Sequence, residues 1–450
     1  MEIPFRFRSG CNKFGKINYS HRFAIMKTCL LCICALLIVQ GCTPISAPSA
    51  STGGGPKVLR LEDANYERDI HTVRLYADGN PMSPAAAQLG QAGLMLEFDD
   101  LKNQREDYYA RIIHCDYNWT QSRLQDLDFI AAYNEFPINN IEFSVDTHIP
   151  YVHYWFQVPP VKLSGNYVLV VYRGSNRDDI VLTRRFLVYE NRVTLKRNQN
   201  LVGQGSVAQV NQQINFTIDH SNLQILNPMQ DVNVTIRQNQ RWDNAATDLK
   251  PMFTREIEKE LEYRFFDDGK MFRGNNEFRF FDMRSLFNPG RNVAYVDRNV
   301  KPFEVHVARD KTRGHEAYAQ YNELNGNYII QNYDQGDESF ANYAWVNFTL
   351  AAAKIEGDVY LMGALTNWQA NEQSKMRYDS TAQQYTGRLL LKQGWYDYLY
   401  HVKSNTLPSH YFEGSHFQTE NRYEVLVYYR PFQPRADLLI GYYVLQENPR

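Results

Sequence analysis

A long succession of short segments, in which apolar and polar residues alternate, constrains this chain more than any other feature. Between residues 57 and 190 the expected strand segments are 71–76, 94–98, 108–114, 141–145, 151–158, 167–172 and 180–188, and of these 71–76 and 94–98 alternate clearly. An alternation of period two places successive side chains on opposite faces and is typical of half-buried β-strands. Turn-forming residues such as Pro159 and Gly165 separate the segments. Short strands in this number predict a β-sandwich over residues 57–190.

Two further sandwiches are expected, over residues 191–342 and 343–450. Aromatic residues make up 14% of the chain, with 31 Tyr and 25 Phe, and such residues favour strands. The alternating segments are 214–218, 232–237, 277–281 and 303–307 in the first stretch, and 346–350, 358–362, 385–391 and 395–402 in the second. Residues 253–266 fit a short helix, because Ile257 and Leu261 stand four apart, but residues 259–266 fit a strand equally well.

The N-terminal region carries an apolar run that is too short to span a membrane permanently. Lys27 precedes the apolar residues 30–39, which have the length of a signal-peptide core. Residues 38–42 resemble the bacterial lipobox, whose cysteine is lipidated and becomes the mature N-terminus. We therefore expect a signal peptide over residues 1–41, with translation starting at Met26, and lipid attachment at Cys42.

The residues after Cys42 are small and uncharged, so residues 42–56 are expected to form a flexible linker. The predicted fold class is thus all-β, with tandem Ig-like or early-set β-sandwich domains behind a lipoprotein signal peptide. Surface-exported lipoproteins resemble one another in carrying acidic residues behind the lipidated cysteine, and residues 43–56 carry none. That difference favours the periplasmic face of the outer membrane.

Charge and cysteine content exclude two classes of protein. Without residues 1–41 the 48 Lys and Arg fall to 42 and the 50 Asp and Glu to 49, a net charge of −7. An acidic body without a basic stripe argues against nucleic acid as a partner. Of the six cysteines only Cys115 lies beyond the signal region and lipid site. The mature protein is therefore not a disulfide-stabilised scaffold.

No catalytic, metal or cofactor site is predicted. The mature region lacks a nucleophile elbow, a zinc-protease motif, a C-x-x-C pair and a glycine-rich phosphate loop. His114 and Cys115 are neighbours in a predicted strand, so their side chains should point to opposite faces. Asp178 and Asp179 are expected to pair with Arg184 and Arg185 across a hairpin, which is ordinary cross-strand pairing.

The C-terminal unit suggests one binding function. The Asn367–Trp368 pair, followed about thirty residues later by Trp395 and Tyr398, resembles the early-set Ig-like modules of starch- and glycogen-binding domains. In those modules such aromatic residues present a platform for a sugar ring. Trp368 and Trp395 are therefore candidates for glycan contact, with a place in the core or in a protein interface as the alternative.

Four stretches of the chain together resemble one family. They are residues 114–119, 151–172, 391–396 and 413–442, and they resemble the plug protein family of the type IX secretion system of Bacteroidetes. The resemblance spans nearly the whole mature chain. It implies a non-enzymatic periplasmic protein that caps the outer-membrane β-barrel translocon of this system.

On this interpretation the partners are the barrel and, through the lipid at Cys42, the bilayer. Interfaces are rich in Tyr, Trp and Arg, and candidate contact residues are Tyr428, Tyr429, Arg430 and Tyr442, of which at least two are expected to pack in the core. The alternative is a glycan-binding outer-membrane lipoprotein that uses Trp368 and Trp395.

Overall fold

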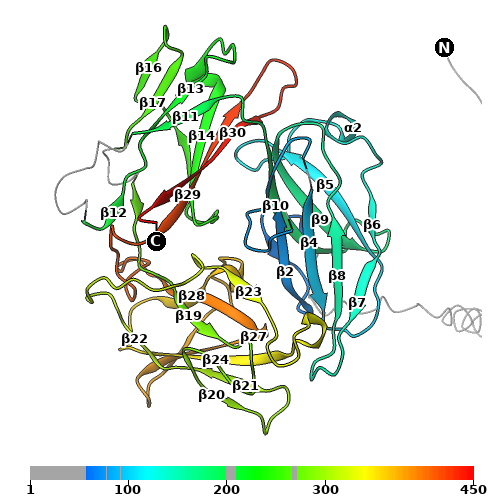
Figure 1. Ribbon diagram of the computed structural model, residues 1–450, viewed down its shortest axis with the longest axis vertical. Coiled ribbons are helices and arrows are strands. Elements are labelled where there is room, and N and C mark those ends of the chain that lie inside the picture. The colour runs from blue at the N-terminus through cyan, green and yellow to red at the C-terminus, as the bar shows by residue number, and fades with distance from the viewer. Residues whose placement is uncertain (1–56, 78, 92, 199–208, 266–270, 450) are drawn as a thin grey trace, which may run out of the picture. The chain divides into compact units, whose positions relative to one another are not determined.

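Strands make up nearly all the regular structure of the described residues, which confirms the predicted all-β fold class (Figure 1). The computed structural model describes residues 57–77, 79–91, 93–198, 209–265 and 271–449. The predicted signal peptide over residues 1–41, the lipid site Cys42 and the linker 42–56 lie outside the described residues. In the part of the chain that the structure describes, no helix is long and apolar enough to cross a membrane.

The first sandwich packs two sheets around an aromatic core. One sheet has the order β1 (Ala64–Asn65), β10 (Ile180–Tyr189), β9 (Gly165–Arg173), β5 (Tyr108–Cys115) and β6 (Phe136–Ile138), with β3 (Ala86–Gln88) parallel to β10. The other has the order β2 (Ile70–Ala77), β4 (Leu94–Asp100), β8 (Val152–Gln157) and β7 (Asn140–Phe143). Between them Phe98 stacks on Tyr154 at 5.0 Å, with the edge of Tyr108 against both rings. The helix α2 (Asp126–Phe129) adds Phe129 to this core.

The second sandwich combines strands from two distant parts of the chain. One sheet has the order β11 (Thr194–Arg197), β13 (Phe216–Asp219), β17 (Glu260–Tyr263) and β16 (Phe253–Arg255). The other has the order β15 (Ala246–Leu249), β14 (Val232–Gln238), β29 (Asn421–Tyr429) and β30 (Leu438–Glu447). Beside them lie the pair β12 (Asn211–Gln212) and β18 (Phe272–Arg273) and the helix α3 (Pro228–Asp231). Figure 1 shows β29 and β30, in red, beside the green strand β14.

The third sandwich is formed by the residues between these two parts. One sheet has the order β20 (Val293–Asp297), β21 (Glu304–Val307), β24 (Tyr343–Ala351), β27 (Gln384–Lys392) and β26 (Arg377–Asp379), with β22 (Asp310–Lys311) beside β24. The facing strands are β19 (Arg279–Asp282), β28 (Gly394–Lys403), β23 (Tyr328–Ile330) and β25 (Asp358–Met362). Two short 3-10 helices, η3 (Glu338–Phe340) and η4 (Ala364–Thr366), lie in its loops.

The expected boundary between residues 342 and 343 does not separate the second and third cores. Strands β19 to β23 precede this boundary but contribute to the third core, whereas β29 and β30 follow it and complete the second. The register sets Val234 opposite Val427 and Ile236 opposite Val425. Alternation predicts a strand with one apolar face, but it does not say which other strand pairs with it in the sheet.

Residues 253–263 form a hairpin, not a helix. Strands β16 and β17 pair with Phe253 opposite Glu262. Leu261 is fully buried, whereas Ile257 lies in the connecting turn and is 94% exposed. The strand alternative is therefore the correct one, because pairing with β13 buries Leu261 in a way that an isolated short helix does not.

A buried ion pair joins the first sandwich to the third. The Asp99 carboxylate on β4 accepts hydrogen bonds from the Lys392 ammonium at 3.0 Å and from the Tyr343 hydroxyl at 2.6 Å, both from the third sandwich. His153 Nδ1 lies 2.7 Å from the other carboxylate oxygen. The Lys392 ammonium also lies 4.2 Å from the ring centre of Tyr151. These contacts satisfy a carboxylate that has no exposure to solvent.

Candidate functional site

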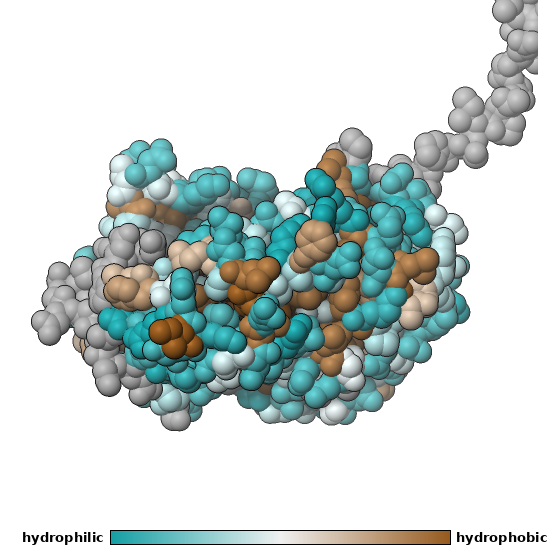
Figure 2. Space-filling view, turned by 90° about the horizontal axis from the view of Figure 1, so that it is seen from above, coloured by the Kyte–Doolittle hydropathy of each residue, from teal (hydrophilic) through white to brown (hydrophobic). Residues whose placement is uncertain are grey.

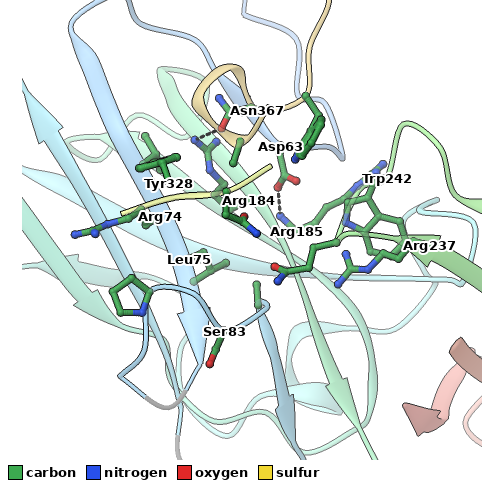
Figure 3. A pocket seen from close by; sticks show the side chains of 17 residues that line it. Asp63, Arg74, Leu75, Ser83, Arg184, Arg185, Arg237, Trp242, Tyr328 and Asn367 are labelled. Carbon is green, nitrogen blue, oxygen red and sulfur yellow. Dashed lines mark hydrogen bonds between the residues drawn. The ribbon is translucent and has the colours of Figure 1, made fainter. Parts of the chain in front are cut away.

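A cavity of about 160 Å³ lies where side chains of all three sandwiches meet (Figure 3). Its lining includes Asp63, Arg74, Ser83, Arg184, Arg185, Arg237, Gln240, Trp242, Tyr328, Asn367 and Trp368. The first sandwich contributes through β2 and β10, the second through β14 and the loop after it, and the third through the start of β23 and the η4 loop. We call it the junction cavity.

Two of the four arginines that line the junction cavity have a carboxylate partner. The Arg74 guanidinium donates to Glu97 at 2.7 Å. The Arg237 guanidinium, which is 4% exposed, donates to Glu424 at 3.0 Å and lies 4.4 Å from the ring centre of Trp242. Both charges are therefore balanced within the protein.

Arg184 and Arg185 form no ion pair with any described residue. The buried Arg184 guanidinium donates to neutral oxygens, with Thr183 O at 2.8 Å and Asn65 Oδ1 at 2.7 Å as the shortest contacts. Arg185 donates from Nε to Leu61 O at 2.8 Å, and its guanidinium lies 4.3 Å from the ring centre of Trp119. Burial lowers the pKa of both side chains, against the attraction of Asp63. Arginine still remains protonated at neutral pH, so the cavity is suited to binding and not to proton transfer.

The expected pairing of Arg184 and Arg185 with Asp178 and Asp179 is wrong. Asp179 lies in the turn before β10 and pairs with Arg173 at 2.8 Å. Arg184 stands opposite Leu169 and Arg185 opposite Val168, well along the strand. At about 3.3 Å per residue the two arginines lie too far from the turn to reach these carboxylates.

The two tryptophans of the predicted sugar platform make contacts within the protein. The Arg241 guanidinium lies 4.3 Å from the ring centre of Trp368, whose edge meets Phe278. Trp395 stacks on Phe280 at 4.5 Å and donates from its indole nitrogen to Asp397 at 3.1 Å. Both rings are half-buried. Their faces are thus partly covered by other side chains, and this arrangement gives no support to the glycan-binding alternative.

The other predicted contact residues divide by burial. Tyr398 and Tyr428 are buried, and their hydroxyls donate to Asp310 at 2.6 Å and to Asn166 at 2.7 Å. Tyr429 and Tyr442 are half-buried, and Arg430 is exposed. Neither buried tyrosine is accessible to a partner. For Tyr429, Arg430 and Tyr442, contact with a partner stays a prediction.

Residues 428–437 instead join the second sandwich to the first. The Tyr428 hydroxyl reaches Asn166 on β9, and the Asp437 carboxylate accepts the Tyr117 backbone N–H at 3.0 Å. Arg430 lies between Asp437 at 3.2 Å and Asp116 at 3.4 Å. Several of the aromatic and charged residues proposed for an external partner thus serve contacts between sandwiches.

His114 and Cys115 lie on opposite faces of β5. His114 meets the edge of Tyr167 at 4.9 Å, whereas Cys115 packs in a separate cluster with Val168 and Val170. Burial lowers the pKa of His114 to about 4 and raises the pKa of Cys115 to about 12. The structure therefore does not bring them together as a nucleophile and base.

Arg184 and Arg185 are the site residues that the sequence interpretation missed. One signal was present, because two adjacent charges interrupt a strand whose other residues are almost all buried on both faces. Two adjacent arginines in an otherwise apolar strand indicate that a polar site lies beside the strand.

Two comparisons with known proteins give matches. The sequence profile of the type 9 secretion system plug protein 1st domain matches residues 70–190, which correspond to β2 through β10. The crystal structure of a hypothetical protein from Parabacteroides merdae ATCC 43184 has a TM-score of 0.80 and 30% sequence identity. The match covers 86% of this chain and 100% of that chain. No curated protein is significantly similar to this chain.

Proposed function

The chain belongs to the type 9 secretion system plug protein family, and from this membership we propose that it is a plug without enzymatic activity. In this function it caps the periplasmic mouth of the outer-membrane β-barrel translocon of that system. A lipid on Cys42 tethers it to the periplasmic face of the same membrane. The observation that carries the proposal is the family match over residues 70–190.

The packing of the three sandwiches supports this function. A wide barrel lumen filled with water leaks unless a body closes it. Buried contacts such as Lys392 with Asp99 and Tyr428 with Asn166 tie both other sandwiches to the first. A body held together in this way keeps its shape while it blocks an opening, and a tether raises its effective concentration at the barrel.

Exposed apolar side chains offer surface for such a contact. Large apolar residues are exposed in all three sandwiches, among them Leu127 (72%), Tyr133 (75%), Leu226 (88%), Ile257 (94%), Phe287 (56%) and Phe432 (74%). Figure 2 shows apolar side chains in several separate groups on an otherwise hydrophilic face. Arg430 is the most exposed of the predicted contact residues and remains in the proposed interface.

The decisive experiment is purification of the tagged, full-length protein in detergent from its own cells. We expect the barrel to co-purify, in larger amount from strains that lack the barrel's other partners, because those partners compete for the open pore. A Cys42→Ala variant in the same experiment separates the two attachments. It should be released into the periplasm unless the barrel itself retains it. Absence of the barrel from every eluate would overturn the plug function.

A further inference from the structure

The charges around the junction cavity do not balance. Arg74 and Arg237 each have their own carboxylate, as described above, which leaves Arg184 and Arg185 against Asp63, the one carboxylate in the lining. Glu62 also attracts Arg185 from outside the lining, but it pairs with Arg60 at 3.2 Å. Asp63 is held by its own contact, since its Oδ1 accepts the backbone N–H of Arg185 at 2.7 Å. A buried guanidinium without a counter-charge is costly, and a bound anion removes that cost.

Of the two arginines without a carboxylate partner, Arg185 is the one that keeps free donors. Among the side-chain nitrogens of Arg185, only Nε donates to a described residue. The four N–H bonds of its two terminal nitrogens therefore have no acceptor among the described residues. Arg184 is different, because its terminal nitrogens already donate to four neutral oxygens. Arg185 is thus the group that binds, and Arg184 adds positive charge behind it. Figure 3 shows both side chains at the cavity, together with Trp242 and Asn367.

Neutral donors from two sandwiches complete the lining. Ser83 lies in the first sandwich, and Gln240 and Trp242 follow β14 in the second. Their side chains form no hydrogen bond to another described residue and can donate to a ligand. The cavity is about 160 Å³, several times the roughly 30 Å³ share of one water molecule. This volume accommodates a small ion with its water.

We propose that the junction cavity is a binding site for a small tetrahedral oxyanion, such as phosphate or a phosphate monoester head group. Arg185 holds the anion, and donors of the second sandwich contact it from the other side. The anion neutralises the excess charge and adds a contact where the three sandwiches meet. This property does not depend on the plug function, because it follows from the lining of the cavity alone.

Calorimetric titration of the folded, full-length protein with inorganic phosphate tests the site directly. Sulfate, acetate and chloride serve as comparisons at constant ionic strength, which holds screening fixed. We expect phosphate and sulfate to bind with one site per chain and to raise the melting temperature, whereas chloride does neither. No binding of phosphate to the folded protein, or tighter binding of acetate than of phosphate, would overturn the proposal.

Three variants locate the binding. Arg185→Gln should weaken phosphate binding by at least about tenfold, because it removes charge-assisted hydrogen bonds. Arg388→Gln is the matched control, since Arg388 also lies over a tryptophan, Trp345, at 4.5 Å, but on the exposed side of the third sandwich. It should leave binding unchanged, and an equal loss in both variants would contradict the assignment.

The Asp63→Asn variant should bind phosphate more tightly, and a misfolded protein would not show such an increase in affinity. Asn keeps an oxygen for the Arg185 backbone N–H but removes the competing negative charge. Phosphate should then bind about threefold to tenfold more tightly, and weaker binding would contradict the proposed charge balance.

Titration with phosphoethanolamine identifies the source of the anion. Binding as tight as that of phosphate assigns a lipid head group, and much weaker binding assigns the free ion.

Discussion

At the scale of single residues, burial changes the chemistry of several side chains without making a catalytic site. His114 is 2% exposed and packs between Tyr167 and Phe129. Burial lowers its pKa to about 4 from the ordinary value of 6.5. A neutral histidine in this position fills space between aromatic rings. Its charge state therefore affects stability and not a reaction.

This shift predicts a pH dependence of folding. The unfolded state binds the proton of His114 below about pH 6.5, and the folded state does so only near pH 4. The neutral, buried His114 side chain therefore makes its full contribution to the free energy of unfolding above pH 6.5. This contribution is lost as the pH falls toward 4, by up to about 3 kcal/mol. His114→Leu should reduce this slope in urea titrations at several pH values. The same change at the exposed His315 should leave the slope unchanged. Equal slopes in the unaltered protein and in both variants would contradict the prediction.

At the scale of elements, some strands that pair in a sheet are far apart in the sequence. Strand β14 carries Val232, Val234 and Ile236 on one face, and its hydrogen-bonded neighbour in the sheet is β29, about 190 residues later. The third sandwich is thus inserted between two parts of the second. Such a pairing depends on long-range contacts, which form only once the intervening residues have folded or closed a large loop.

This arrangement predicts how fragments behave. Residues 57–342 lack β29 and β30, so their apolar strand β14 loses its main partner. This fragment should bind a hydrophobic dye and lack a fixed near-ultraviolet circular dichroism signal from its second sandwich. Residues 57–190 contain the whole first core and should unfold cooperatively in urea. Native-like unfolding of the second sandwich within residues 57–342 would contradict this prediction.

At the scale of the whole described body, buried polar contacts hold the sandwiches together. Burial by itself would raise the pKa of Asp99, but the charge of Lys392 and the hydrogen bonds from His153 and Tyr343 outweigh burial and lower it. The ion pair therefore stabilises the contact between the first and third sandwiches above the unfolded pKa of the carboxyl. Its contribution is lost at strongly acidic pH.

Removal of one partner should be more damaging than removal of both. Lys392→Met leaves the Asp99 charge buried without its cation and should lower the free energy of unfolding by about 3–5 kcal/mol. The double variant with Asp99→Asn should recover part of this loss, as a double-mutant cycle in urea measures. Lys375→Met is the control, because its pair with Asp358 lies at the protein surface, and its loss should cost far less than the loss of the buried pair. Similar losses for Lys392→Met and Lys375→Met would contradict a special contribution of the buried pair.

The sequence by itself determined the strands and the family. Segments such as 94–98 and 346–350 lie within β4 and β24, because a period of two is a local property that any partner strand can satisfy. The resemblance to the plug family also depends on local motifs, and the match over residues 70–190 confirms it.

Only the tertiary structure decided which faces meet. The pairing of β14 with β29, the burial of Tyr398 and Tyr428, and the position of Arg184 and Arg185 at the junction cavity all depend on contacts between distant residues. Alternation specifies that a side chain has a buried face but not what covers it. For that reason two arginines that looked like ordinary hairpin partners lie at the site where the three sandwiches meet.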